Sequence, residues 1–223
     1  MCDCFKGTGK VITETRTPSD YTRIELNDNI NLVITQDSIN KISVEGGEKL
    51  LPNIQTEFVD NKLIIKNNNK CNWVRSYKNK FTVYVSAKSL KRIEYFGSGN
   101  ITSTNTLVAD TLEINCLESS GKIDIMANTQ NNFLRIHTGS TDMYVSGNTN
   151  ENFLYNTSNG FAHLENLHTN INTIVSSTTG DCYVNADQKL DVTIKYIGNV
   201  YYYGNPSTIN TNISGKGQLI KLN

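Results

Sequence analysis

Apolar and polar residues alternate along most of the chain, in short segments of four to eight residues that are bounded by Asn, Asp or Gly. Clear examples lie at residues 30–34, 63–65 and 81–85. A period of two is typical of strands with one buried face. No window keeps the i, i+3, i+4, i+7 spacing of an amphipathic helix over a useful length. The pattern therefore predicts an all-β protein.

From residue 99 onward, the alternating pattern repeats about every 20 residues. The repeats begin at seven corners, six of them glycines: Gly99, Gly121, Thr141, Gly160, Gly180, Gly198 and Gly217. A period of 20 to 50 residues is typical of stacked coils that share one core. We predict a right-handed, parallel β-helix-like solenoid with coils of about 20 residues. Its hand follows only from the general preference for right-handed parallel crossovers.

Aligning the corners places residues of similar type in columns. The position two residues after the corner holds Ile101, Ile123, Met143, Ala162, Cys182, Val200 and Leu219. The position four residues after it holds Ser103, Ile125, Val145, Leu164, Val184, Tyr202 and Lys221. Both columns are mostly apolar, so we expect them to face inward. A second strand follows, with inward residues Leu112, Ile114, Cys116, Leu134, Ile136, Ile171, Ile174, Leu190, Val192, Ile194, Ile209 and Ile213.

The chain has 223 residues, a length that all-β folds often use as one domain. We expect an N-terminal tether at 1–10 and a single solenoid domain at 11–223. Its coils are irregular at 11–95, with corners at 28–29, 61–62 and 79–80, and regular at 96–223. The alternative for the first part is a small antiparallel sheet that caps the solenoid.

The stretch YFGSGNITS at 95–103 resembles a phosphate-binding loop, which requires a helix directly after its glycines. The residues that follow have the pattern of a strand, a turn and a second strand. We therefore expect Gly99 to be the first regular corner of the solenoid. There it would adopt a backbone conformation that is costly for residues with a Cβ atom.

Charge and composition exclude several classes of partner. Lys and Arg together number 21, as do Asp and Glu, so no overall field favours nucleic acid or an anionic surface. The 31 Asn and 24 Thr residues, against 3 Pro, favour turns and strands. No apolar run approaches the roughly 20 residues of a membrane-spanning helix.

The five cysteines suggest different roles. Cys2 and Cys4 precede a polar stretch with glycines, which fits a lipid attachment site at a mature lipoprotein start. Ordinary cysteines at a frayed end are the alternative. Cys116 and Cys182 fall on inward faces and are expected to be buried free thiols. Cys71 lies in a polar stretch and is a candidate to pair with Cys4 in an oxidising compartment.

Residues that could carry chemistry are scattered over the predicted coils. The three histidines, His137, His163 and His168, share no column with each other or with a Ser or Cys nucleophile. Three acidic residues near corners also fall in different columns or in non-adjacent coils: Asp124, Asp142 and Asp181. The sequence predicts no catalytic site, no cofactor and no metal site.

One outward column is aromatic in four successive coils, at Tyr144, His163, Tyr183 and Tyr201. Neighbouring strands lie about 4.8 Å apart, so these rings are expected to form a ladder. The ladder is a candidate ligand-facing surface for a sugar polymer or a partner protein. The alternative is that stacking of the rings stabilises the solenoid itself.

Three segments resemble the head GIN domain family, also called auto-transporter adhesins and common among lipoproteins of Bacteroidetes. They are GTGKVITETRTPSDYTRIELNDNINLVITQ at 7–36, VEGGEKLLPNIQTEFVDNKLIIKN at 44–67 and GSGNI at 97–101. The resemblance implies a β-helix-like fold, a secreted or outer-membrane lipoprotein, and no established enzymatic activity. It favours Cys2, with Cys4 second, as the lipidated residue. The chain departs from the family pattern at Asp28, Asn61 and Thr141.

These observations predict a non-enzymatic lipoprotein of the cell envelope that acts as a binding or adhesion module for a glycan or a cell-surface protein. It would be extracytoplasmic, on the periplasmic or the surface face of the outer membrane. A lipid anchor would be its only membrane contact, and no nucleic acid is expected. The alternatives are a structural envelope or assembly component and a polysaccharide-active enzyme on a β-helix.

Overall fold

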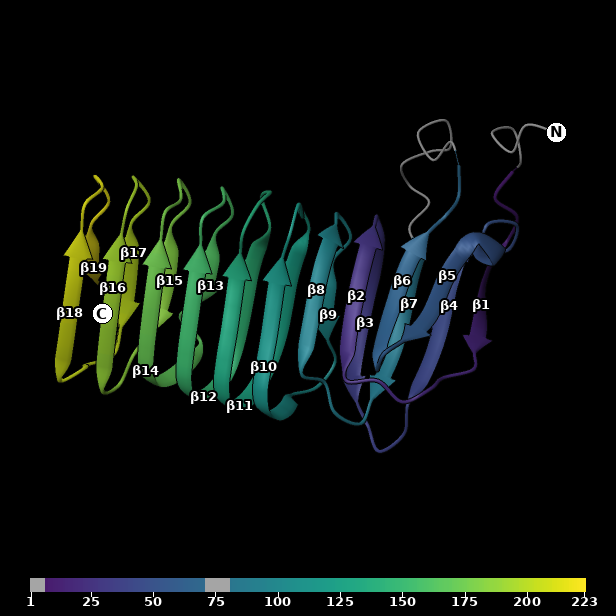
Figure 1. The fold of residues 1–223 in the computed structure, drawn as a ribbon, viewed down its shortest axis with the longest axis horizontal. Helices are drawn as coiled ribbons and strands as arrows, with labels where there is room; N and C mark the ends of the chain where they lie inside the picture. Colours follow the sequence, from purple (N-terminus) through teal and green to yellow (C-terminus); the bar gives the residue numbers. More distant parts are fainter. Residues whose placement is uncertain (1–6, 71–80) are drawn as a thin grey trace.

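The computed structural model describes residues 7–70 and 81–223, which form one row of stacked coils (Figure 1). The first part holds β1 (Val11–Arg16), β2 (Arg23–Asp28), β3 (Ile30–Gln36), β4 (Lys41–Gly47), the 3-10 helix η2 (Leu51–Asn53), β5 (Ile54–Val59), β6 (Lys62–Asn67) and β7 (Phe81–Ala87). The next strands are β8 (Arg92–Gly97), β9 (Ile101–Ser103), β10 (Leu107–Cys116), β11 (Lys122–Ile136) and β12 (Asp142–Asn156). The last are β13 (Ala162–Leu164), β14 (Leu167–Ser176), β15 (Cys182–Asn185), β16 (Lys189–Ile194), β17 (Val200–Tyr203), β18 (Thr208–Ile213) and β19 (Leu219–Lys221).

From β8 onward each coil pairs in parallel with the next, which confirms the predicted solenoid with coils of about 20 residues. The column that begins at Ile101 continues in register through Ile123 and on to Leu219. All its members except Leu219 are buried. A column of apolar side chains therefore runs along the solenoid, as the sequence predicted.

The first part is less regular, as expected, because chain order and spatial order differ there. The coil formed by β2 and β3 lies between the coil of β6 and β7 and the coil of β8 and β9 (Figure 1). Three pairs of strands are antiparallel: β1 with β4, β4 with β7, and β5 with β6. The N-terminal end thus combines two parallel coils with antiparallel strands at its edge. The antiparallel sheet considered as the alternative is therefore present in part.

One inward assignment of the second strand, Ile171, needs correction. Ile171 is only half-buried, and the neighbouring Asn172 is fully buried in the inward column with Asn132 and Asn152. The Asn152 Nδ2 atom donates a hydrogen bond to Asn172 Oδ1 at 2.9 Å, and Asn172 Nδ2 donates to the backbone oxygen of Asn185 at 2.9 Å. Amide pairing makes Asn acceptable inside the solenoid, which simple apolar patterning misses.

At the other end, Ile209 and Ile213 of β18 continue inward columns but remain 41% and 46% exposed. They belong to the last coil of the described chain, so one side of each is uncovered there. Ile209 and Ile213 therefore occupy the predicted inward columns, but their side chains are not fully buried.

Cys116 and Cys182 are buried free thiols, as predicted. Burial raises the pKa of Cys116 to about 12 and that of Cys182 to about 11. Both therefore remain neutral thiols at physiological pH and act as small apolar core residues. Cys2, Cys4 and Cys71 lie outside the described residues.

Gly99 is a corner, as predicted, but the reason given for glycine was wrong. Its φ angle is not positive. The requirement is space, because a Cβ atom at Gly99 would lie 1.9 Å from the backbone oxygen of Ile30 in the adjacent coil. Gly160 meets Thr141 O at the same distance. Successive glycine corners therefore stack backbone on backbone, with no room for a side chain, whereas the corner at Thr141 holds a buried one.

No helix in the described ranges, 7–70 and 81–223, is long and apolar enough to cross a membrane.

We predict that Gly99→Ala destabilises the solenoid by about 2 kcal/mol or more, because a methyl group cannot fit without separating two coils. Gly7→Ala is the matched control, since nothing lies within 4 Å of a Cβ atom there. Chemical denaturation of both variants measures the effect. Equal stability of the two variants would contradict the steric explanation.

Candidate functional site

The predicted aromatic column forms a stacked ladder on β12, β13, β15 and β17. Its ring centroids are 4.2 Å apart between Tyr144 and His163, 5.2 Å between His163 and Tyr183, and 4.9 Å between Tyr183 and Tyr201. The interplanar angles are 7°, 3° and 10°. The alignment of the four residues is therefore as expected, while their role in binding a ligand stays a prediction.

The stacking decides which part of the ladder a ligand can reach. Ring faces lie against one another, and the Lys122 Nζ atom sits 4.3 Å from the centroid of the Tyr144 ring. Beyond Tyr201 the column continues with Ile220. The ladder therefore presents ring edges and polar tips outward. A sugar ring cannot stack on faces that already contact each other, so the faces contribute to the stability of the solenoid.

The acidic residues near the corners mostly serve the backbone of the adjacent coil. Asp142 Oδ1 accepts a hydrogen bond from the Phe161 amide at 3.0 Å, and Asp181 Oδ1 accepts one from Asn199 at 2.8 Å. Asp124 pairs with Lys122 at 2.8 Å. Each of these three carboxylates therefore has a partner within the protein. Across the described residues, no three His, Cys, Asp or Glu side chains form a group that could hold a metal ion.

The histidines are separate in space as well as in sequence. The ring of His137 packs at 5.5 Å from that of Tyr155. His163 belongs to the ladder, with its Nδ1 atom 3.7 Å from Glu165 Oε1. His168 lines a polar cleft described below. The three histidines therefore have different surroundings: an aromatic pair, the ladder and the polar cleft.

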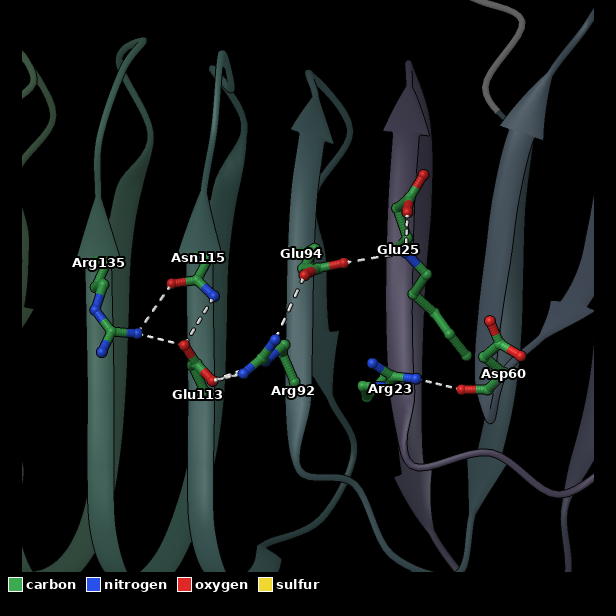
Figure 2. Close-up of polar contacts among 9 residues, drawn as sticks. Arg23, Glu25, Asp60, Arg92, Glu94, Glu113, Asn115 and Arg135 are labelled. Carbon is green, nitrogen blue, oxygen red and sulfur yellow. Dashed lines mark hydrogen bonds and ion pairs between the residues drawn. The ribbon is translucent and has the colours of Figure 1, made fainter.

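A row of side chains with both signs of charge, which sequence reasoning missed, crosses the strands β6, β2, β8, β10 and β11 (Figure 2). We call it the charged row. It comprises Arg23, Glu25, Lys62, Arg92, Glu94, Glu113 and Arg135 on β2, β6, β8, β10 and β11. Register places Arg92 beside Glu113. Arg23, which lies between Lys62 and Arg92 in the same column, donates to the backbone oxygen of Asp60 instead. The only sequence signal was the recurrence of charge at alternate positions in different coils.

Glu113 lies at the centre of one half of this row. Its Oε2 atom accepts hydrogen bonds from Arg92 Nε at 2.7 Å and Nη2 at 2.6 Å. Its Oε1 atom contacts Arg135 and accepts a bond from Asn115 at 3.1 Å. Burial favours the protonated acid, but the hydrogen bonds from Asn115 and Arg92 and the two positive charges outweigh it. The pKa of Glu113 is therefore lowered.

The other half of the row is centred on Lys62. Its Nζ atom lies 2.5 Å from Glu25 Oε2 and 3.4 Å from Glu94 Oε2. Burial opposes ionisation of Glu25, yet hydrogen bonds from Lys62 and Asn27 lower its pKa. The hydrogen bond to Glu25 is the main reason that the pKa of Lys62 is raised. The charges thus neutralise one another and hold coils together.

Two clefts lie side by side on β11, β12 and β14, and the sequence did not predict either. The polar cleft, of about 360 Å³, is lined by Thr129, Gln130, Asn148, Thr149, Asn150, His168, Asn170 and Asp187. The aromatic cleft, of about 210 Å³, is lined by Asn131, Asn132, Phe133, Glu151, Asn152, Phe153, Ile171 and Thr173. The repetition of Asn and Phe at a 20-residue spacing was the signal that could have indicated them.

Comparison with known protein families shows the family of this chain. A family model described as "Putative auto-transporter adhesin, head GIN domain" matches residues 20–206. The chain belongs to this family. No curated protein matches the chain.

Solved structures from Bacteroidetes share the fold of this head GIN domain. A "putative adhesin" from Bacteroides fragilis NCTC 9343 superposes with a TM-score of 0.86, at 21% identity over 96% of this chain and 97% of that one. A "putative adhesin" from Parabacteroides merdae ATCC 43184 gives 0.70, at 22% identity over 97% and 98%. A "putative lipid binding protein" from Parabacteroides distasonis ATCC 8503 gives 0.73, at 21% identity over 97% and 98%.

We predict that Glu113→Gln lowers the free energy of unfolding at pH 7 by about 1 to 2 kcal/mol, because Arg92 and Arg135 lose their shared counter-charge. A lowered pKa stabilises the fold above the ordinary glutamate value of 4.5, and this contribution is lost as the pH falls through the lowered pKa. The variant should therefore lose less stability than the wild type when denaturation is repeated at decreasing pH below 4.5.

Asp124→Asn is the control for this prediction, since its pair with Lys122 is about half exposed on both sides. Its effect on stability should stay below about 0.5 kcal/mol. A parallel acid-induced loss of stability in the wild type and Glu113→Gln would contradict the role given to Glu113.

Proposed function

We propose that this head GIN domain is a non-enzymatic binding or adhesion module of the cell envelope that recognises a glycan or a cell-surface protein. The observation that carries the proposal is the outer surface of the solenoid. There the strand register aligns outward side chains in columns, and neighbours within a column lie about 4.8 Å apart. Such a surface is preorganised, so little conformational entropy is lost on binding. Membership of a family described as adhesins supports the same role.

Two surfaces are available for contact with a ligand. One is the outer edge of the aromatic ladder, which offers the polar tips of Tyr144, Tyr183 and Tyr201. The other is the pair of clefts on β11, β12 and β14. Near the ladder, Asp142 and Asp181 already accept hydrogen bonds from backbone amides and Asp124 pairs with Lys122, which weighs against a polysaccharide-active enzyme that would use these three residues.

A structural role in assembly is the second candidate, and the exposed strand β18 favours it. All six of its residues, Thr208–Ile213, are exposed, and none is charged or Pro. In the part of the chain that the structure describes, β18 pairs with β16 alone. Edge strands usually carry charges that prevent pairing with other molecules. A second copy or another envelope protein could therefore extend the sheet here.

We further propose that the domain is extracytoplasmic and tethered to the outer membrane by lipid on Cys2, with Cys4 as the alternative. Both residues lie outside the described part of the chain. Two acyl chains would anchor the protein firmly, since each buried CH₂ contributes about 0.8 kcal/mol. The resemblance to a family common among lipoproteins of Bacteroidetes supports the anchor, and the solved structures that share the fold come from Bacteroides and Parabacteroides.

Metabolic labelling with an alkyne fatty acid tests the anchor in cells that express the complete gene. We expect the label to be lost in Cys2→Ala and kept in Cys4→Ala. The opposite result would move the anchor to Cys4, and a label that persists in the double variant would exclude both.

The binding function is tested with the purified domain on an array of neutral, amino and acidic glycans and on cells with intact or protease-treated surfaces. We expect saturable binding to one of these targets. The double variant Tyr183→Ser with Tyr201→Ser should melt at a lower temperature, because two stacked rings are lost. If its binding is unchanged, the ladder is structural and the clefts become the contact surface. Absence of any saturable target would contradict the proposed function.

A further inference from the structure

The two clefts adjoin across a bend shared by three coils. At the bend, Gln130, Asn150 and Asn170 line the polar cleft, and the residues after them, Asn131 and Glu151 among them, line the aromatic cleft. The Asn170 Nδ2 atom donates a hydrogen bond to Asn150 Oδ1 at 3.0 Å, which fixes this ridge. An elongated ligand that crosses the ridge would contact both clefts at once.

The aromatic cleft has ring surface that the ladder lacks. The centroids of Phe133 and Phe153 lie 6.5 Å apart at an interplanar angle of 51°, so these two rings do not cover each other. The guanidinium carbon of Arg135 lies 5.3 Å from the Phe133 centroid and 6.0 Å from that of Phe153. Both rings are half-buried and thus held in place. Glu151 and Thr173 add polar groups around this apolar surface.

The polar cleft is built from groups that can both donate and accept hydrogen bonds. Side-chain amides of Gln130, Asn148 and Asn150 supply much of its lining, whereas the hydroxyl groups of Thr129 and Thr149 are hydrogen-bonded within the protein. Amides match the mixed donor and acceptor character of sugar hydroxyls. An apolar ring surface beside a dense set of such groups fits a ligand whose ring has a C–H face and polar edges.

Charge narrows the class of ligand. Among the described residues that line the clefts are two carboxylates, Glu151 and Asp187, and neither Lys nor Arg. A uronic or sialic acid unit would bring a third negative charge, and the cation beside the two Phe rings, Arg135, already pairs with Glu113. Neutral sugars, whose hydroxyl groups donate to carboxylates, avoid this cost.

We infer that the two clefts form one binding site for a neutral oligosaccharide, with a pyranose ring on Phe133 and Phe153 and the adjoining unit hydrogen-bonded in the polar cleft. This site rests on the proposed binding function and specifies its ligand. Recognition would come from the clefts, while the aromatic ladder maintains the solenoid.

The test measures affinity by titration calorimetry with the strongest neutral oligosaccharide from the glycan array. We expect Phe153→Ala to weaken binding at least about tenfold and Asp187→Ala about fivefold. Tyr155→Ala is the matched control: it removes an aromatic ring two residues from Phe153 on the same strand, outside both clefts. Its affinity should stay within about twofold. Thermal melting verifies that each variant is folded. Asp187 is exposed, so Asp187→Ala should fold normally and still tests the site if Phe153→Ala is unstable.

The outcomes separate this inference from the proposed function. Unchanged affinity in both cleft variants, or stronger binding of uronic acid polymers than of neutral glycans, would overturn the site while a glycan-binding function remains. Binding to a protease-sensitive cell surface without any glycan binding would also overturn the site and leave the adhesion role intact. If the wild type binds no target at all, both proposals fail.

Discussion

The close stacking of one backbone on the next is the constraint on which the rest of this structure depends. At the corners, coils approach so closely that a side chain at Gly99 or Gly160 would overlap a carbonyl oxygen of the adjacent coil. This contact keeps the coils in register over the regular part of the chain. Register then decides everything that lies in columns: the apolar core, the buried amides of Asn152 and Asn172, and the outward side chains.

Two outward columns show how the same spacing is used in different ways. In the aromatic ladder, identical geometry in each coil lets rings stack face to face. In the charged row, opposite charges in neighbouring coils meet, as Glu113 does between Arg92 and Arg135. In both arrangements the side chains interact mainly with one another, within the protein. The clefts differ, because the tilted rings of Phe133 and Phe153 leave apolar surface beside polar groups that face solvent.

The repeat could be predicted from the sequence because a parallel solenoid is a local rule applied many times. Period-two alternation and the 20-residue spacing of Gly corners defined the coils, the inward columns and the aromatic ladder. Features that depend on contacts between distant segments could not be predicted. The insertion of β2 and β3, the pairing of Asn172 with its neighbour, and the charged row all depend on which coil lies next to which. The clefts depend on a bend that alternation alone does not specify.

The insertion of β2 and β3 has a consequence for the order of folding during synthesis. These strands are made early, directly after β1, yet one of their two neighbouring coils is completed only when β7 is made, and the other only when β9 is made. Contacts between segments so far apart in sequence form slowly. The later coils each need only the coil before them and can add one by one. The N-terminal end, next to the proposed anchor, is thus where a nascent chain would remain open longest and depend most on protection from aggregation.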